Sequence, residues 1–248
     1  VLWKPPGWDA TVGDVDERLA RRSAASRAAG QGSWPLHEWV AALLGPGRPI
    51  ARDAAAAHGL AHRLDSGTSG PLLCAKSYRG YYLALQQFVA RRVRKEYLCL
   101  CHGWLGPAPL LVEAPLRTVL DSAGGRRSEA GAGGLHAATE VRAAHHCCGP
   151  GGEPLSLVRL ALRTGRMHQL RAHLGALGHP LVNDPRYGGC VWPWCPRIFL
   201  HACRLGIDIG DGPIDVESAL PEDLAQVWRV ITPAARRDRV HLRALGLG

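Results

Sequence analysis

The sequence predicts an α+β fold in which helices pack on a mixed, mainly antiparallel sheet. Two stretches are typical of strands: residues 97–103 alternate between two faces, and residues 155–162 are almost continuously apolar. Residues 33–44 and 167–177 repeat apolar side chains at helical spacing. Strands and helices do not follow a regular strand–helix–strand rhythm, which favours a mixed or antiparallel sheet over a parallel one.

The expected helices have recognisable ends. Ser33 can cap the first helix, and Gly45 followed by Pro46 ends it. Ser77 can cap another helix that runs to about Ala90. The apolar stripe expected on that helix consists of Tyr78, Tyr82, Leu85 and Val89. In the helix at 167–177, Met167, Leu170, Leu174 and Leu177 share one face, and Gly178 ends it.

Shorter elements and loops fill the remaining chain. Further strands are expected at 1–3, 138–143 and 199–209, and a short helical tail begins at Pro221. Glycine-rich residues 121–134 and 149–154 are predicted to be loops. Residues 14–32 are charged and alanine-rich, and the pattern fits a helix or a loop equally.

Composition limits the class of protein. A chain of 248 residues can bury a real core, and we expect a single domain over 1–248. A net charge of +9 favours a polyanionic partner, with nucleic acid first, although a basic surface can also serve solubility alone. No apolar run reaches the ~18 residues of a membrane span, so no membrane partner is expected. We expect a monomer.

The eight cysteines do not form a disulfide-scaffold pattern, and Cys190 and Cys195 lack a zinc spacing. A reducing compartment therefore fits best. This is expected to be the cytoplasm, or an organelle such as a mitochondrion or plastid if a targeting segment has been trimmed before Val1.

Asp65 is the first candidate for chemistry. It stands between His62-Arg63 and a run of small turn-forming residues, Ser66 to Gly70. A lone Asp before Ser-Gly is most often a turn residue that binds its own backbone. The apolar neighbour Leu64 places the carboxylate near the core, and the small residues behind it leave space in front. Both interpretations stay open on these residues alone.

A second candidate is the basic start of the helix at 167–177. Arg166, His168, Arg171 and His173 crowd there around Gln169. A basic solvated face is the ordinary explanation, but one arginine could instead pair with a carboxylate from elsewhere. His168 and His173 are five residues apart and do not share a helix face, so a metal site is not expected.

Together these motifs resemble the RluA-type pseudouridine synthases. The stretch HRLDSGTSG at 62–70 is similar to the family signature H-R-L-D-x-x-T-S-G. The other similar blocks are KPPGW at 4–8, RVRKEYLCLCHG at 92–103, TGRMHQLRAHLGALGHPLVNDPRYG at 164–188, FLHA at 199–202 and LPEDL at 220–224. The resemblance covers nearly the whole chain and implies the pseudouridine synthase fold with a central catalytic cleft.

The resemblance also implies an activity. An RNA uridine, in tRNA or rRNA, is flipped out of its stack and isomerised to pseudouridine without metal or cofactor. By this resemblance Asp65 is the nucleophile, Tyr97 lies against the base, and Arg171 pairs with the aspartate. The residues implied in RNA or substrate binding are Lys4, His62, Arg63, Arg166, His168, Gln169 and Leu170. Replacing Arg171 by Met is expected to abolish turnover with a modest change in stability.

Several segments depart from the family pattern. The 54 residues at 8–61 are more than compact relatives have, so an insertion is expected around 14–50. Residues 121–136 are glycine-rich and fit the family poorly. Asn183 replaces a common glycine, and Pro71 replaces a common leucine. No S4-like RNA-binding domain is expected in this chain.

Two other functions remain as alternatives. One is a catalytically inactive RNA-binding or RNA-folding protein on the same fold, which would have no need of a buried acid. The other is a metal-free acid/base hydrolase, which needs a second carboxylate near Asp65. Asp184 is the candidate for that second carboxylate.

Overall fold

The computed structural model describes residues 1–10, 34–121 and 124–235. The expected helix or loop at 14–32 and the Ser33 cap lie outside these residues. The chain forms two compact units. The first unit contains residues 1–94 and 204–218, and the second contains residues 95–203 and 219–248. Each unit is described by itself, and the expected single domain stays a prediction.

The first unit is built from short strand pairs. β1 (Leu2–Lys4) pairs antiparallel with β4 (Gly70–Leu72), and β2 (Trp8–Asp9) pairs parallel with β3 (Trp34–Pro35). β12 (Pro213–Glu217) pairs antiparallel with the end of β11 (Leu200–Asp208). The pairing of β1 with β4 places the start of the chain beside the segment that follows Asp65.

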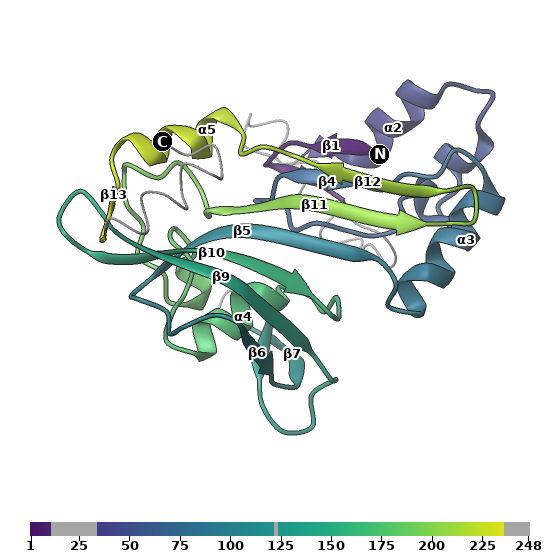
Figure 1. The fold of residues 1–248 in the computed structure, drawn as a ribbon. Helices are drawn as coiled ribbons and strands as arrows, with labels where there is room; N and C mark the ends of the chain where they lie inside the picture. The colour runs from purple at the N-terminus through teal and green to yellow at the C-terminus, as the bar shows by residue number, and fades with distance from the viewer. Residues whose placement is uncertain (11–33, 122–123, 236–248) are drawn as a thin grey trace. The chain divides into compact units, whose positions relative to one another are not determined.

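Helices complete the first unit (Figure 1). α2 (Leu36–Leu44) ends at Gly45, whose φ of 69° favours glycine. α3 (Tyr78–Val89) begins as predicted, because the Ser77 hydroxyl accepts a hydrogen bond from the backbone N–H of Gly80 at 3.2 Å. The turns η1 (Pro49–Arg52) and η2 (Ala57–Gly59) connect α2 to the Asp65 segment.

The predicted apolar stripe of α3 is wrong at Tyr78, Tyr82 and Val89, whereas Leu85 packs partly buried against the core. Tyr82 and Val89 are 58 % and 84 % exposed, whereas Tyr81 and Ala84 are buried in the core of this unit. Phe88 packs partly buried against the same core. The helix offers two stripes at helical spacing, and the buried one contains Ala84, whose small side chain permits close packing. The other buried members of this core are Ile50, Ala56, Ala57, Ala61, Leu73, Val93, Leu205 and Ile207.

The second unit is organised around an antiparallel sheet, as predicted. β5 (Arg94–His102) and β9 (Ala138–Cys148) flank β10 (Pro154–Leu162), and these strands lie side by side in Figure 1. β6 (Leu110–Glu113) and β13 (Thr232–Pro233) both pair with β9. The N–H of Leu100 donates to the carbonyl of Phe199 at 3.2 Å, just before β11 begins.

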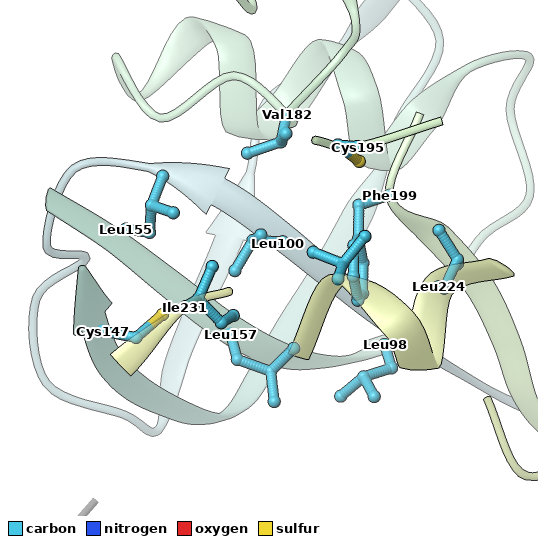
Figure 2. Close-up of a cluster of buried hydrophobic side chains, with 11 residues drawn as sticks. Leu98, Leu100, Cys147, Leu155, Leu157, Val182, Cys195, Phe199, Leu224 and Ile231 are labelled. Atoms are coloured by element: carbon cyan, nitrogen blue, oxygen red, sulfur yellow. The ribbon is translucent and has the colours of Figure 1, made fainter. Parts of the chain in front are cut away.

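A cluster of buried hydrophobic side chains lies on one face of this sheet (Figure 2). Alternate residues of β5 and β10 point into it, and α5 (Glu222–Ala225) with η4 (Gln226–Arg229) packs over them. Its buried members are Leu98, Leu100, Cys147, Leu155, Leu157, Val182, Cys195, Phe199, Leu224, Val227 and Ile231. The predicted alternation along residues 97–103 is confirmed.

One predicted loop is a hairpin. β7 (Leu116–Leu120) pairs antiparallel with β8 (Arg126–Ala130), and β8 lies inside the glycine-rich region predicted to be irregular. The prediction for 121–134 is therefore wrong at 126–130. Glycines at 124, 125, 131, 133 and 134 flank a short alternating segment in which Ser128 is buried, and that segment is long enough for a strand.

α4 (Gln169–Ala176) is shorter than the predicted helix and more deeply buried. Leu170 and Leu174 are buried as expected, but Gln169, Arg171 and His173 are buried too. The helix lies next to the β7–β8 hairpin (Figure 1). A solvated basic face is therefore not the explanation for this motif. None of the helices in the described residues is long and apolar enough to cross a membrane.

Candidate active site

Asp65 lies in a tight turn of the first unit. Its backbone carbonyl accepts a hydrogen bond from the N–H of Thr68 at 2.9 Å, and Leu64 before it is 5 % exposed. The Asp65 side chain is half-buried, whereas Thr68 and Ser69 are buried. The turn and the displayed carboxylate are therefore compatible, because the backbone makes the turn.

A buried lysine supports this turn. Lys4 is 0 % exposed, and its ammonium group donates to the carbonyl oxygens of Pro5, Trp8 and Ser66 at 3.0, 2.8 and 3.0 Å. The N–H of Gly7 donates to the same Ser66 carbonyl at 2.8 Å. Lys4 thus fixes the backbone directly after Asp65. The structure assigns Lys4 a supporting role, and its expected contact with RNA stays a prediction.

His62 also supports the segment from inside the unit. Its Nε2 accepts a hydrogen bond from the N–H of Leu73 at 3.0 Å, and its ring packs against Phe88 with centroids 5.0 Å apart. Accepting that bond makes Nε2 the unprotonated nitrogen. Arg63, by contrast, is exposed. Of these two neighbours, Arg63 is the one whose charge is available at the surface.

Tyr97 and Arg171 belong to the second unit. Tyr97 is 6 % exposed in β5 and lies opposite Leu160 of β10. Arg171 forms a two-point ion pair with Asp184, with Nε to Oδ2 and Nη2 to Oδ1 both 2.7 Å. The side chains of this pair are 8 % and 0 % exposed. Such a fork geometry fixes the guanidinium plane as well as its charge.

Tyr187 is a member of this site that sequence reasoning did not single out. The guanidinium carbon of Arg171 lies 5.0 Å from the centre of its ring. Its hydroxyl accepts the N–H of Ser128 at 2.9 Å and lies 3.0 Å from Nδ1 of His168. The signal was present in the sequence, because Tyr187 lies in the same family-like block as Arg171 and Asp184.

Gln169 is the centre of a buried polar network. Its Oε1 accepts from the Thr164 hydroxyl at 2.7 Å and from the N–H of Arg166 at 3.0 Å. Its amide nitrogen donates to the Ala138 carbonyl and the Thr139 hydroxyl at 2.9 and 3.0 Å. With these bonds and 2 % exposure, Gln169 holds α4 to β9. Its predicted contact with RNA stays a prediction.

The remaining predicted residues divide between surface and interior. Leu170 is 4 % exposed. Arg166 is exposed, and its Nε donates to the carbonyl of His136 at 3.1 Å. His168 precedes α4 with a positive φ of 50°. The buried His173 contacts the Thr139 hydroxyl and the Ala114 carbonyl at 2.9 Å each, and burial lowers the pKa of its ring. His168 and His173 therefore have different partners, and neither histidine pairs with the other.

Asn183 shows why the family glycine can be replaced here. Its φ is 60°, a left-handed conformation that Asn tolerates better than most residues. Its side chain is also used: Oδ1 accepts the N–H of Trp192 at 2.6 Å, and the amide donates to the Cys195 carbonyl. The replacement keeps the backbone geometry next to Asp184 and orders the segment at 192–195.

The predicted catalytic residues thus lie in two units. Asp65 belongs to the first, and Tyr97 and Arg171 belong to the second. The expected pairing of Asp65 with Arg171 and the expected central cleft stay predictions. In residues 1–10, 34–121 and 124–235 there is no group of three or more His, Cys, Asp or Glu side chains placed to hold a metal ion.

Comparisons with known proteins agree with these motifs. Residues 49–176 match the family model described as RNA pseudouridylate synthase. A tRNA pseudouridine synthase C from Salmonella typhi is 32 % identical over 211 residues, which cover 73 % of this chain and 81 % of that protein. A ribosomal large subunit pseudouridine synthase D from Nitrosomonas europaea is 33 % identical over 184 residues, or 70 % of this chain and 51 % of that protein.

A solved structure supports the predicted fold. The human RNA pseudouridylate synthase domain containing 1 superimposes with a TM-score of 0.61 at 29 % identity, over 76 % of this chain and 80 % of that one. The predicted pseudouridine synthase fold, α+β with a mainly antiparallel sheet, is confirmed.

Proposed function

Because this chain belongs to the RNA pseudouridylate synthase family, we propose that it isomerises specific uridines of tRNA or rRNA to pseudouridine, with Asp65 as the nucleophile. In this reaction the bond from the ribose to N1 of uracil breaks, and a bond to C5 forms. The proton on C5 is released to solvent, and N1 gains a proton. The reaction is an isomerisation, so it balances without an oxidant or a cofactor.

The observation that carries this proposal is the Asp65 turn within the matched region. A half-buried carboxylate is displayed from a turn whose backbone is fixed by a fully buried lysine. Burying a lysine is costly unless its ammonium group is hydrogen-bonded, and here its three carbonyl partners include that of Ser66, directly after Asp65. The relatives named for tRNA and for ribosomal RNA support RNA as the substrate class.

The second unit supplies the other proposed roles. Tyr97 would offer its ring as a stacking face for the uracil. Arg171 would hold Asp65 ionised, which a nucleophile requires, because a nearby cation favours the carboxylate form. Its fork with Asp184 and its contact with Tyr187 fix the guanidinium orientation in advance. Leu170, Arg63, Arg166 and His168 remain proposed contacts to RNA, alongside Lys4, His62 and Gln169.

The alternatives fit less well. A hydrolase would need Asp184 as a second carboxylate, but both Asp184 oxygens are engaged by Arg171 at 2.7 Å. A pure RNA-binding protein would not need the supported Asp65 turn. We further propose a monomer in a reducing compartment. No disulfide joins the eight cysteines, all of which lie in the described residues, and this supports that compartment.

The test is release of tritium from RNA labelled at uridine C5. The parent protein is given tRNA and rRNA separately, because the proposal names both and only the modified one will release label. Asp65→Asn should bind RNA and remain folded but lose at least ~10³-fold in rate. The matched control is Asp211→Asn, an exposed aspartate of the same unit. Parent-like release by Asp65→Asn would refute the nucleophile, and no release by the parent would favour the pure binder.

A further inference from the structure

The solvent-facing side of α3 differs from an ordinary polar helix face. Tyr78, Tyr82 and Val89 are 39 %, 58 % and 84 % exposed, along the stripe that the sequence predicted to be buried. Lys76, Arg79, Arg91 and Arg92 are exposed at and beyond the ends of the same helix. We call the exposed residues Lys76, Tyr78, Arg79, Tyr82, Arg91 and Arg92 the α3 surface.

This surface has a strong positive charge. Residues 76–95 contain six Lys or Arg residues and no Asp or Glu. Among the described residues, Asp53 accepts the Tyr78 hydroxyl at 2.9 Å, and Asp215 lies 3.5 Å from Arg94. Few acidic side chains therefore neutralise the cations of Lys76, Arg79, Arg91 and Arg92. The resulting positive potential attracts polyanions.

Aromatic rings interleaved with cations suit one kind of polyanion. Cations attract the phosphates of a nucleic acid, and exposed rings offer stacking faces to unpaired bases. The Tyr82 ring is held edge-on to buried Tyr81, with centroids 5.4 Å apart. An acidic protein partner would also match the charge and cover the rings. RNA is favoured because it is the proposed substrate of the chain that carries this surface.

The same helix is packed onto the segment that carries Asp65. Phe88, on the opposite side of α3, contacts the His62 ring at 5.0 Å, and His62 in turn accepts the N–H of Leu73. The α3 surface and the Asp65 turn therefore belong to one unit. RNA bound at the α3 surface would be held by the same body that presents the nucleophile.

From these observations we propose that the α3 surface binds the RNA substrate outside the target nucleotide, through phosphates at its arginines and an unpaired base on Tyr82. This rests on the proposed function, since it names RNA as the ligand. The surface contributes affinity and not chemistry, so its loss should raise KM and leave kcat nearly unchanged.

Binding and turnover are tested separately. Two variants are made: the double variant Arg91→Asn with Arg92→Ser, and the single variant Tyr82→Ala. RNA affinity is measured with each variant in the Asp65→Asn background, and tritium release is measured with each variant in the parent. Asn is chosen at 91 because φ there is 56°. The control pair, Arg48→Ser with Arg229→Ser, removes the same charge from exposed positions elsewhere.

We expect the 91/92 pair to weaken RNA binding at least tenfold and to make the negative slope of log K against log[salt] shallower by about 1.4 to 1.8. Tyr82→Ala should weaken it about tenfold with an unchanged salt slope. The kcat at saturating RNA should stay within about twofold of the parent. If the 91/92 and Tyr82 variants bind RNA as tightly as the control pair does, the proposal is overturned and a protein partner is favoured for this surface. RNA binding that depends on these residues in a protein without isomerase activity would refute the proposed function but support this surface.

Discussion

The Asp65 turn and the Arg171 block support their functional side chains in different ways. Around Asp65, support comes through the backbone: the buried Lys4 ammonium holds the Ser66 carbonyl, and the Asp65 carbonyl accepts the N–H of Thr68. Around Arg171, support comes through side chains, because Asp184 and Tyr187 hold the guanidinium directly.

This difference indicates how each residue can be changed. A carboxylate displayed from a backbone-made turn can be neutralised without unfolding the turn, so Asp65 variants report on chemistry. A charge buried in a side-chain network cannot be removed without leaving its partners unpaired. Variants of Arg171 therefore report on stability and activity together.

The largest stability effect is expected for Arg171→Met. The change leaves the buried Asp184 carboxylate without its two-point partner, which costs about 3–5 kcal/mol of unfolding free energy. The modest effect expected from the sequence alone does not allow for that buried partner. Urea unfolding followed by circular dichroism measures the loss.

Two further variants separate the network from the mere loss of an arginine. Arg166→Met removes an exposed arginine of the same motif and should change stability by less than ~0.5 kcal/mol. Adding Asp184→Leu to Arg171→Met removes the unpaired charge and should recover part of the loss. The loss caused by Asp184→Leu alone is measured in the parent. If Asp184→Leu lowers the stability of Arg171→Met by that same amount, the ion pair is not the source of the effect.

Much of this second region was predictable because its pattern is local. The strands at 97–103 and 155–162 alternate or stay apolar, and the structure has them as β5 and β10. Arg171 and Asp184 lie in one motif, but their pairing joins residues 13 apart through a fold that periodicity does not describe. Nothing in the charge pattern of the segment distinguishes a buried arginine from an exposed one.

The errors in the first region have a different origin. On α3, two stripes have helical spacing, and their residue types alone do not distinguish the stripe that meets the core. Tyr82 is aromatic, which is typical of a core residue, but it is exposed. Ala84 is buried instead, because its small side chain lets the helix pack closely. Lys4 could not be identified as buried, since its partners are backbone carbonyls of distant residues such as Ser66.

The next largest effect is expected for Lys4→Met. Methionine fills a similar volume but leaves the carbonyls of Pro5, Trp8 and Ser66 without the ammonium donor, at a cost of about 2–3 kcal/mol. The Asp65 turn should loosen, and tritium release should fall about 10²-fold because the nucleophile is no longer positioned. The exposed Lys76→Met is the control for stability. Normal turnover in Lys4→Met would show that the turn does not depend on this support.

A smaller effect is expected for Tyr187→Phe. The ring under Arg171 remains, but the hydroxyl that meets the Ser128 N–H and His168 is lost, which costs about 1–2 kcal/mol. Hydrogen exchange should accelerate at the Ser128 amide while most of β10 is unchanged. The control is Tyr82→Phe, whose side chain is exposed. Unchanged protection at Ser128 would mean that other contacts secure the β7–β8 hairpin.

The smallest effect concerns Lys95, two residues before Tyr97. Burial lowers the pKa of its ammonium to about 8, below its usual value of 10.5. Between these values the unfolded chain binds the proton and the folded chain does not, so folding stability rises with pH. The unfolding free energy of the parent, relative to that of Lys95→Met, should therefore rise by up to about 1 kcal/mol from pH 8 to pH 9. One proton contributes at most about 1.4 kcal/mol per pH unit. Taking the difference between the two proteins removes the titration of thiols and tyrosines. A difference that stays flat across this range would place the Lys95 ammonium in contact with water or with an anion that restores its usual pKa.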